Sequence, residues 1–146
     1  MKDNTDLTKI KIFTDGGSRG NPGPSAIGVF ISDGLGQTLA EIGKTIGIGT
    51  NNRAEYGAIV EGLDWVIKNK SRFPKLLEIN FSMDSNLAMS QLNGLYKVKN
   101  PEIRNFIFDI RKKEMELNLK ITYSHVPREQ NKVADRLVNL ALDNKL

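Results

Sequence analysis

The chain contains no cysteine and a single histidine among its 146 residues. The absence of cysteine excludes disulfide bridges, thiolate metal sites and thiol catalysis, and it fits a reducing compartment. The single histidine, His125, excludes a metal site built from several imidazoles. Any metal centre must therefore use oxygen ligands, which favour Mg²⁺ or Mn²⁺ over zinc.

Long apolar runs are also missing. The N-terminal segment MKDNTDLTK is charged and lacks the apolar core of a secretion signal, and no later run is long enough to span a bilayer. We therefore expect a cytoplasmic protein with no membrane association. The length and a hydrophobic content of 39% fit a single domain over residues 1–146. No feature of the sequence indicates a protein partner, so we expect a monomer.

The overall charge is modestly positive, with a net charge of +4 and an isoelectric point near 9.3. An excess of this size suits attraction to a polyanion, but an ordinary solvated basic surface explains it equally well. Charge alone therefore decides nothing. The meaning of the positive charge depends on whether the chain also carries an acidic, cation-binding centre.

The hydrophobic pattern predicts an α/β fold. Alternating apolar and polar residues predict five strands, over 9–15, 26–32, 37–47, 77–83 and 119–126. Apolar residues at helical spacing predict four helices, over 52–70, 85–92, 101–117 and 132–142. We expect a mixed five-stranded sheet flanked by helices, with an antiparallel meander of strands one to three and with strands one, four and five parallel. Gly16-Gly17 is predicted to end the first strand, and Asp33-Gly34 is a favoured hairpin dipeptide.

Four carboxylates stand in polar segments: Asp15 in FTDGGSRGNPGP, Glu55 in TNNRAEY, Asp84 in SMDSN and Asp135 in HVPREQNKVAD. Asp15 and Asp84 end predicted strands, where α/β proteins usually form sites, and Glu55 shares the apolar stripe of its helix. Each one alone could serve as a turn, cap or helix-dipole residue. Together they would repel one another and be costly to bury unless a hard cation neutralised them. The sequence therefore predicts a divalent metal site.

These segments, in this order, resemble type 1 ribonuclease H over roughly residues 9–142, through FTDGGSRGNPGP, TNNRAEY, the DS of MDSN and HxxxxxNxxxD. The resemblance implies the ribonuclease H-like fold and an endonuclease that hydrolyses the RNA strand of RNA/DNA hybrids. It implies two Mg²⁺ ions, with Mn²⁺ as a possible substitute, and products with 5′-phosphate and 3′-hydroxyl ends. It places Asp15 between the two ions, Glu55 and Asp84 on one side and Asp135 on the other.

The resemblance also gives His125 a role. It matches a mobile histidine that assists proton transfer or product departure, a task suited to a side chain that ordinarily titrates near neutral pH. Without the motif, a lone histidine is more often structural or merely exposed.

Six further polar residues match the family's substrate-binding region: Asn21, Thr50, Asn51, Asn52, Ser85 and Asn86. The asparagine amides can donate to and accept from the 2′-hydroxyl that distinguishes RNA from DNA. Thr50 matches a position that helps hold a DNA phosphate, and Asn86 stands where many members have glutamine. Any one of these residues, taken alone, also fits a turn or a helix cap.

The chain departs from some bacterial members by lacking a tryptophan-bearing basic protrusion between the middle helices. The short segment Tyr96-Lys97-Val98-Lys99-Asn100 replaces it. Lys97 and Lys99, with Arg104, could form a smaller phosphate-binding face, although a solvated surface explains these charges equally well.

Two other readings remain open. A related metal-dependent nuclease could act on double-stranded RNA or a DNA junction, because the same fold serves several substrates. A catalytically silent hybrid-binding module is the second alternative. The presence of all four carboxylates argues against it, since a pure binder has no need of acidic groups facing phosphate.

Overall fold

The computed structural model describes residues 5–94 and 97–146. Its five strands are β1 (Lys9–Ser18), β2 (Gly23–Asp33), β3 (Thr38–Gly49), β4 (Glu78–Met83) and β5 (Lys120–His125). Its four α-helices are α1 (Asn51–Asn69), α2 (Asn86–Leu92), α3 (Pro101–Leu117) and α4 (Lys132–Leu142). The short 3₁₀ helices η1 (Lys70–Arg72) and η2 (Arg128–Gln130) follow α1 and β5. The predicted order of strands and helices is confirmed.

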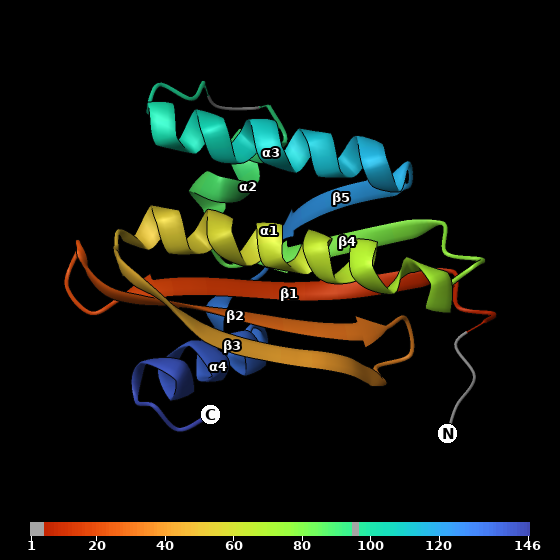
Figure 1. Cartoon of the computed structure of the whole chain (residues 1–146), viewed down its shortest axis with the longest axis horizontal. Helices are drawn as coiled ribbons and strands as arrows, with labels where there is room; N and C mark the ends of the chain where they lie inside the picture. Colours follow the sequence, from red (N-terminus) through yellow and green to blue (C-terminus); the bar gives the residue numbers. More distant parts are fainter. Residues whose placement is uncertain (1–4, 95–96) are drawn as a thin grey trace.

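The strands form one sheet in the order β3-β2-β1-β4-β5 (Figure 1). β1 pairs antiparallel with β2, and β2 with β3, whereas β1, β4 and β5 run parallel. The mixed sheet therefore has the predicted topology. α1 covers β1 and β2 on one face, α3 packs against α1, and α4 packs on the opposite face over β1, β2 and β3.

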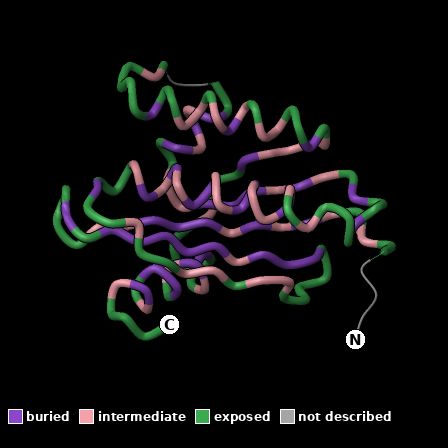
Figure 2. Tube along the Cα trace, in the orientation of Figure 1, coloured by how far each residue is buried: buried purple, intermediate pink, exposed green. Residues whose placement is uncertain are grey.

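The main core lies between the sheet and α1. Ile12 of β1, Leu63 of α1 and Phe81 of β4 are all fully buried there. The buried stretches in Figure 2 follow β1 and β2 and the side of α1 that faces them. No helix within the described ranges is long and apolar enough to cross a membrane.

The first strand runs further than the sequence predicts. Gly16 and Gly17 do not end it; both pair with β2, and β1 continues to Ser18. The reason is packing, because a Cβ atom on Gly16 would lie 2.2 Å from the carbonyl carbon of Ala54. The missing side chain lets α1 approach the strand closely, so this glycine serves helix packing rather than a turn.

The β2–β3 hairpin is also longer than a two-residue turn. The backbone N–H groups of Leu35 and Gln37 both donate to Oδ1 of Asp33, at 2.8 Å each. The residue with positive φ is Gly36, at 91°, rather than Gly34. The Asp33-Gly34 prediction therefore located the hairpin correctly but assigned the wrong turn.

Candidate active site

The close approach of α1 to β1 brings two carboxylates together. Glu55 follows Ala54, the residue that packs on Gly16, and therefore faces Asp15 across this contact. Asp15 lies in β1 with Gly16 and Gly17 after it, so the acid sits inside the paired strand and not at its end. The backbone of Gly16 hydrogen-bonds both carboxylates.

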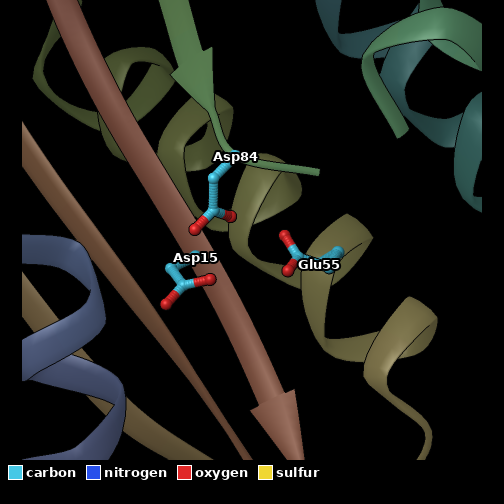
Figure 3. Close-up of side chains that lie close together, drawn as sticks. All are labelled: Asp15, Glu55 and Asp84. Atoms are coloured by element: carbon cyan, nitrogen blue, oxygen red, sulfur yellow. The ribbon is translucent and has the colours of Figure 1, made fainter. Parts of the chain in front are cut away.

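Asp84 joins them from the neighbouring strand. β4 runs parallel to β1, and the pairing of Thr14 with Met83 places the next residues, Asp15 and Asp84, side by side. Asp15, Glu55 and Asp84 each offer a carboxylate oxygen within 4.8 Å of the others (Figure 3). Three separate elements thus supply the oxygen ligands that a hard divalent cation prefers.

The fourth acid, Asp135, comes from the opposite face of the sheet. Gly28 lets α4 approach β2, because a Cβ there would lie 2.1 Å from the carbonyl oxygen of Ala134. Asn131, buried just before α4, donates from Nδ2 to the backbone oxygen of Thr14 at 2.8 Å. These contacts position Asp135, which hydrogen-bonds Asp15 and lines the same cleft.

The electrostatics of the cluster show carboxylates whose charged forms are disfavoured by burial first and by mutual repulsion second. Burial, followed by the charges of Asp84 and Asp135, raises the pKa of Asp15 from 3.8 to about 7. Burial and the charges of Asp15 and Asp84 raise the pKa of Glu55 well above its usual value. The pKa of Asp84 is also raised by burial, while the charge of Arg128 opposes the change. Oxygen-only donors held against repulsion fit a divalent cation, which would neutralise them.

The cluster opens into a cleft of about 570 Å³. Asn51, Asn52 and Ser85 line it beside the four acids. Arg128 also lines it and lies 3.5 Å from Asp135, measured between Nη2 and Oδ1. The cleft thus combines a floor of carboxylates with a largely exposed arginine at its edge.

A second cleft of about 500 Å³ shares Asn51 and Asn52 with the first. It lies where α1 and α3 begin, and its further lining residues are Asn21, Thr50, Asn100, Glu102 and Ile103. We call it the amide cleft.

The oxygen atoms of the amide cleft are already engaged by backbone N–H groups. Oδ1 of Asn21 accepts from the backbone N–H of Asn51 at 3.1 Å, and Oδ1 of Asn51 accepts from that of Ser18 at 2.9 Å. Oδ1 of Asn100 caps α3 by accepting from the N–H of Glu102 at 2.8 Å. Each of these amides therefore directs its NH₂ group elsewhere as a donor. Donors of this kind suit phosphate and hydroxyl oxygens.

The hydroxyl caps follow the same arrangement. Oγ1 of Thr50 accepts from the N–H of Arg53 at 3.2 Å at the start of α1, and Oγ of Ser85 accepts from that of Ala88 at the start of α2. Each hydroxyl retains its own hydrogen for a ligand. A capping role and a binding role are thus compatible at both residues.

The remaining predicted residues lie outside both clefts. His125 ends β5 beside Met83, is exposed, and acts on Asp84 through its charge without lining the cleft. Asn86 is the exposed first residue of α2. Lys97 and Lys99 are exposed, and Tyr96 lies outside the described residues.

Some residues of the clefts were not singled out from the sequence. Arg128 and Asn100 were present in the quoted segments, but their segments gave no reason to prefer them. Arg19 lines the acidic cleft and forms an ion pair with Asp143 at 2.6 Å. The sequence did contain a signal for Arg19, because this residue lies in the same FTDGGSRGNPGP motif as Asp15.

Comparison with known proteins agrees with this geometry. Residues 13–141 match the family model described as "Reverse transcriptase-like". A bifunctional protein of Mycobacterium tuberculosis is 39% identical over 92% of this chain, which corresponds to 36% of that protein's length. The ribonuclease HI of Halobacterium salinarum is 36% identical over 93% of the chain and 65% of its own length. The chain thus spans only part of these curated relatives.

Among solved structures, ribonuclease H1 LC11, isolated from compost by a metagenomic approach, superimposes with a TM-score of 0.89 at 43% identity. That match covers 94% of this chain and 98% of LC11. A further structure of LC11 contains an RNA/DNA hybrid. The ribonuclease H1 structure of the halophilic archaeon matches at a TM-score of 0.83 and 36% identity, over 93% and 98% of the two chains. The chain therefore belongs to the type 1 ribonuclease H family.

Proposed function

We propose that this protein is an endoribonuclease that hydrolyses the RNA strand of RNA/DNA hybrids. The observation that carries the proposal is the junction of the two clefts, where the cleft of the acidic cluster and the amide cleft share Asn51 and Asn52. In a duplex that lies across both clefts, one nucleic-acid strand would meet the carboxylates and the other would meet the amide donors. The hybrid-bound structure of LC11, 43% identical to this chain, supports the substrate assignment.

Asp15, Glu55, Asp84 and Asp135 would hold the divalent ions, with Mg²⁺ as the natural choice and Mn²⁺ as a substitute. Two such ions, when bound, activate the attacking water and stabilise the leaving 3′ oxygen, giving 5′-phosphate and 3′-hydroxyl ends. The fit rests on the donor set, because carboxylates with raised pKa values gain most from a cation.

The other side chains bind and orient the duplex. Asn21, Asn51 and Asn52 present amides to the sugar and base edges, where a 2′-hydroxyl distinguishes RNA from DNA. Thr50 offers its hydroxyl to a phosphate of the DNA strand. Ser85 and Asn86, at the start of α2, would contact the minor groove.

His125 and the lysines complete the assignment. We assign His125 a role in proton transfer or product departure. His125 ends β5 and pairs with Met83 of β4, the residue that precedes Asp84. Lys97 and Lys99 are assigned to phosphate contacts beyond the clefts. Residues 1–146 would act as one ribonuclease H domain.

One assay tests the proposal. Labelled RNA/DNA, RNA/RNA and DNA/DNA duplexes are incubated with Mg²⁺, Mn²⁺ or chelator, and the products are mapped. We expect cleavage of the RNA strand of the hybrid alone, with either metal and not with chelator. Preferred cleavage of double-stranded RNA would replace the substrate assignment, and metal-independent binding without cleavage would identify a silent binding module.

A further inference from the structure

Glu102 brings a negative charge into a cleft that otherwise presents donors. It is the second residue of α3, and its side chain lines the amide cleft beside Thr50 and Asn100. Its Oε2 atom lies 3.1 Å from Nη2 of Arg53, which is in the first turn of α1. This ion pair therefore connects the beginnings of the two helices at the cleft.

The surroundings of this carboxylate attract anions. α1 and α3 are 19 and 17 residues long, and both begin at the cleft, so the positive ends of two helix dipoles meet there. Their caps, Thr50 and Asn100, have their acceptor oxygens engaged and keep their donor hydrogens. Glu102 is the anion that this environment now holds.

The ion pair is poorly placed to serve stability. The side chains of Arg53 and Glu102 are 44% and 47% exposed, and ion pairs this open to water contribute little to folding. Arg53 has a second contact, from Nη1 to the backbone oxygen of Ile48 at 3.4 Å, and Thr50 accepts from its backbone N–H, so neither contact depends on Glu102. The position of the carboxylate is better explained by its effect on a bound anion.

We propose that Glu102 is an internal competitor of the nucleic-acid phosphate in the amide cleft. Its carboxylate holds Arg53 and repels the incoming backbone, so duplex binding must first weaken the Arg53–Glu102 pair. Glu102 thereby lowers affinity and speeds release of the duplex. The proposal rests on the function proposed above and assigns a residue that sets how tightly the substrate is held.

The direct test is Glu102→Gln, which removes the charge and preserves the size and a hydrogen-bonding oxygen. Hybrid affinity is measured by fluorescence anisotropy with chelator, so that no cleavage occurs, and KM and kcat are measured with Mg²⁺. We expect a Kd and a KM about three- to tenfold lower, no increase in kcat, and a salt slope steeper by about one as Arg53 gains a phosphate contact.

A matched control separates a local effect from a change in net charge. Glu116→Gln makes the same substitution on the exposed surface of the same helix, roughly 20 Å further along its axis. We expect its Kd, KM and salt slope to stay close to those of the wild type. An equal gain in both variants, or no gain in Glu102→Gln, would overturn the proposal.

Arg53→Gln tests the competition itself. If Glu102 holds Arg53 away from phosphate, Arg53→Gln should raise Kd more in the Glu102→Gln background than in the wild type. An equal rise in both backgrounds would show that the two charges act independently and would refute the competition. Unfolding curves of the wild type, Glu102→Gln, Arg53→Gln and the double variant should lie close together, apart from the small loss expected when a negative charge is removed from a helix N-terminus. A large loss of stability in Glu102→Gln would instead show a structural clamp.

The outcomes also separate this inference from the function on which it rests. Hybrid cleavage with no response to Glu102→Gln would refute the competitor and leave the enzyme assignment in place. Absence of hybrid cleavage in the wild type would refute the enzyme assignment, while the anisotropy measurements would still report whether Glu102 opposes duplex binding.

Discussion

The acidic cluster and the amide cleft adjoin one another and share two asparagines, yet their chemistry is opposite. In the cluster, carboxylate oxygens from separate elements converge on one point, and the pKa values of three of them are raised by burial and repulsion. In the amide cleft, Oδ1 of Asn21, Asn51 and Asn100 accepts from backbone N–H groups, which leaves the NH₂ groups of these amides as donors for a ligand. One region therefore favours a cation, whereas the other offers donors that suit an anion.

This contrast matches the two needs of a nuclease. Phosphate must be held near carboxylates that would repel it, and this becomes favourable only when cations neutralise the acids and nearby donors fix the backbone. Removing either half should therefore have a distinct signature. Changes in the cluster should abolish chemistry, and loss of a donor in the amide cleft should weaken binding.

The largest effect is expected from Asp15→Asn, which removes one charge at nearly constant size. Loss of a supporting residue around a metal site already costs about 10- to 100-fold, so loss of this central acid should lower kcat by more than about a hundredfold. Steady-state cleavage of a labelled hybrid measures it, with Asp109→Asn on α3 as a remote control. Wild-type turnover by the Asp15 variant would remove this residue from the site.

Gly16→Ala should break the cluster by moving α1. The new Cβ would lie 2.2 Å from a backbone carbon of Ala54, which no side-chain rotation can relieve. Overpacking of this kind costs about 1–3 kcal/mol, and displacement of Glu55 should also reduce activity. Gly17→Ala is the matched control, because its Cβ would meet only Cγ1 of Val138 at an ordinary 3.7 Å. Equal unfolding curves for the two variants would contradict the packing argument.

Without divalent metal, the folded state should lose stability as the pH rises. The pKa of Asp15 is raised from 3.8 to about 7, so its protonated form is favoured by folding. The associated stability is fully present below about pH 4 and disappears as the pH rises through about 7. Urea unfolding in chelator at pH 5 and pH 8 should show this fall. Asp15→Asn should reduce this decrease in the free energy of unfolding, and added Mg²⁺ should restore the stability of the wild type at pH 8. If the decrease between pH 5 and pH 8 is the same in the variant, groups other than Asp15 cause it.

Asn100→Asp tests the donor side of the comparison. Aspartate caps a helix about as well as asparagine, so the free energy of unfolding should change little. The NH₂ donor is replaced by a charged acceptor, however, and hybrid affinity should fall about tenfold, as expected for a lost contact of about 1.4 kcal/mol. Gln37→Glu in the exposed β2–β3 hairpin controls for net charge. If Asn100→Asp lowers the free energy of unfolding but leaves the hybrid affinity unchanged, Asn100 serves only as the cap of α3.

Much of this arrangement could be predicted from the sequence because periodicity records which side of an element is buried. Alternation in the strands gave the sheet, and the position of Glu55 on an apolar stripe indicated that it faces inward. The contacts between distant segments leave no such record. The role of Gly16 depends on Ala54 of another element, and the Asn51 amide oxygen is engaged by the backbone N–H of Ser18, 33 positions away.

The local chemistry of the turn illustrates the same limit. Asp33-Gly34 correctly predicted a hairpin, but the turn is set by two N–H groups that reach the Asp33 carboxylate and by the positive φ of Gly36. The pairing of Glu102 with Arg53 was equally invisible, because the two residues are 49 positions apart. Ion pairs between different helices or strands can be identified only from the three-dimensional arrangement of those elements.

The smallest effect is expected at the segment that joins α2 to α3. Lys97 and Lys99 are exposed, and the chain beside them is anchored by Nε of Arg104, which donates to the backbone oxygen of Val98 at 3.0 Å. If the two lysines contact phosphates, Lys97→Ala/Lys99→Ala should raise KM severalfold with little change in kcat, because binding shared by ground and transition states is lost.

The salt dependence gives the independent measure of this last prediction. Each lost phosphate contact should flatten the slope of log affinity against log salt by nearly one, so the double variant should lose about one to two units. Lys68→Ala/Lys145→Ala removes the same charge from two other exposed positions, in α1 and after α4, and should leave KM and the salt slope unchanged. If both double variants behave alike, Lys97 and Lys99 belong to the solvated surface, and the amide cleft with Arg53 and Arg128 must hold the duplex.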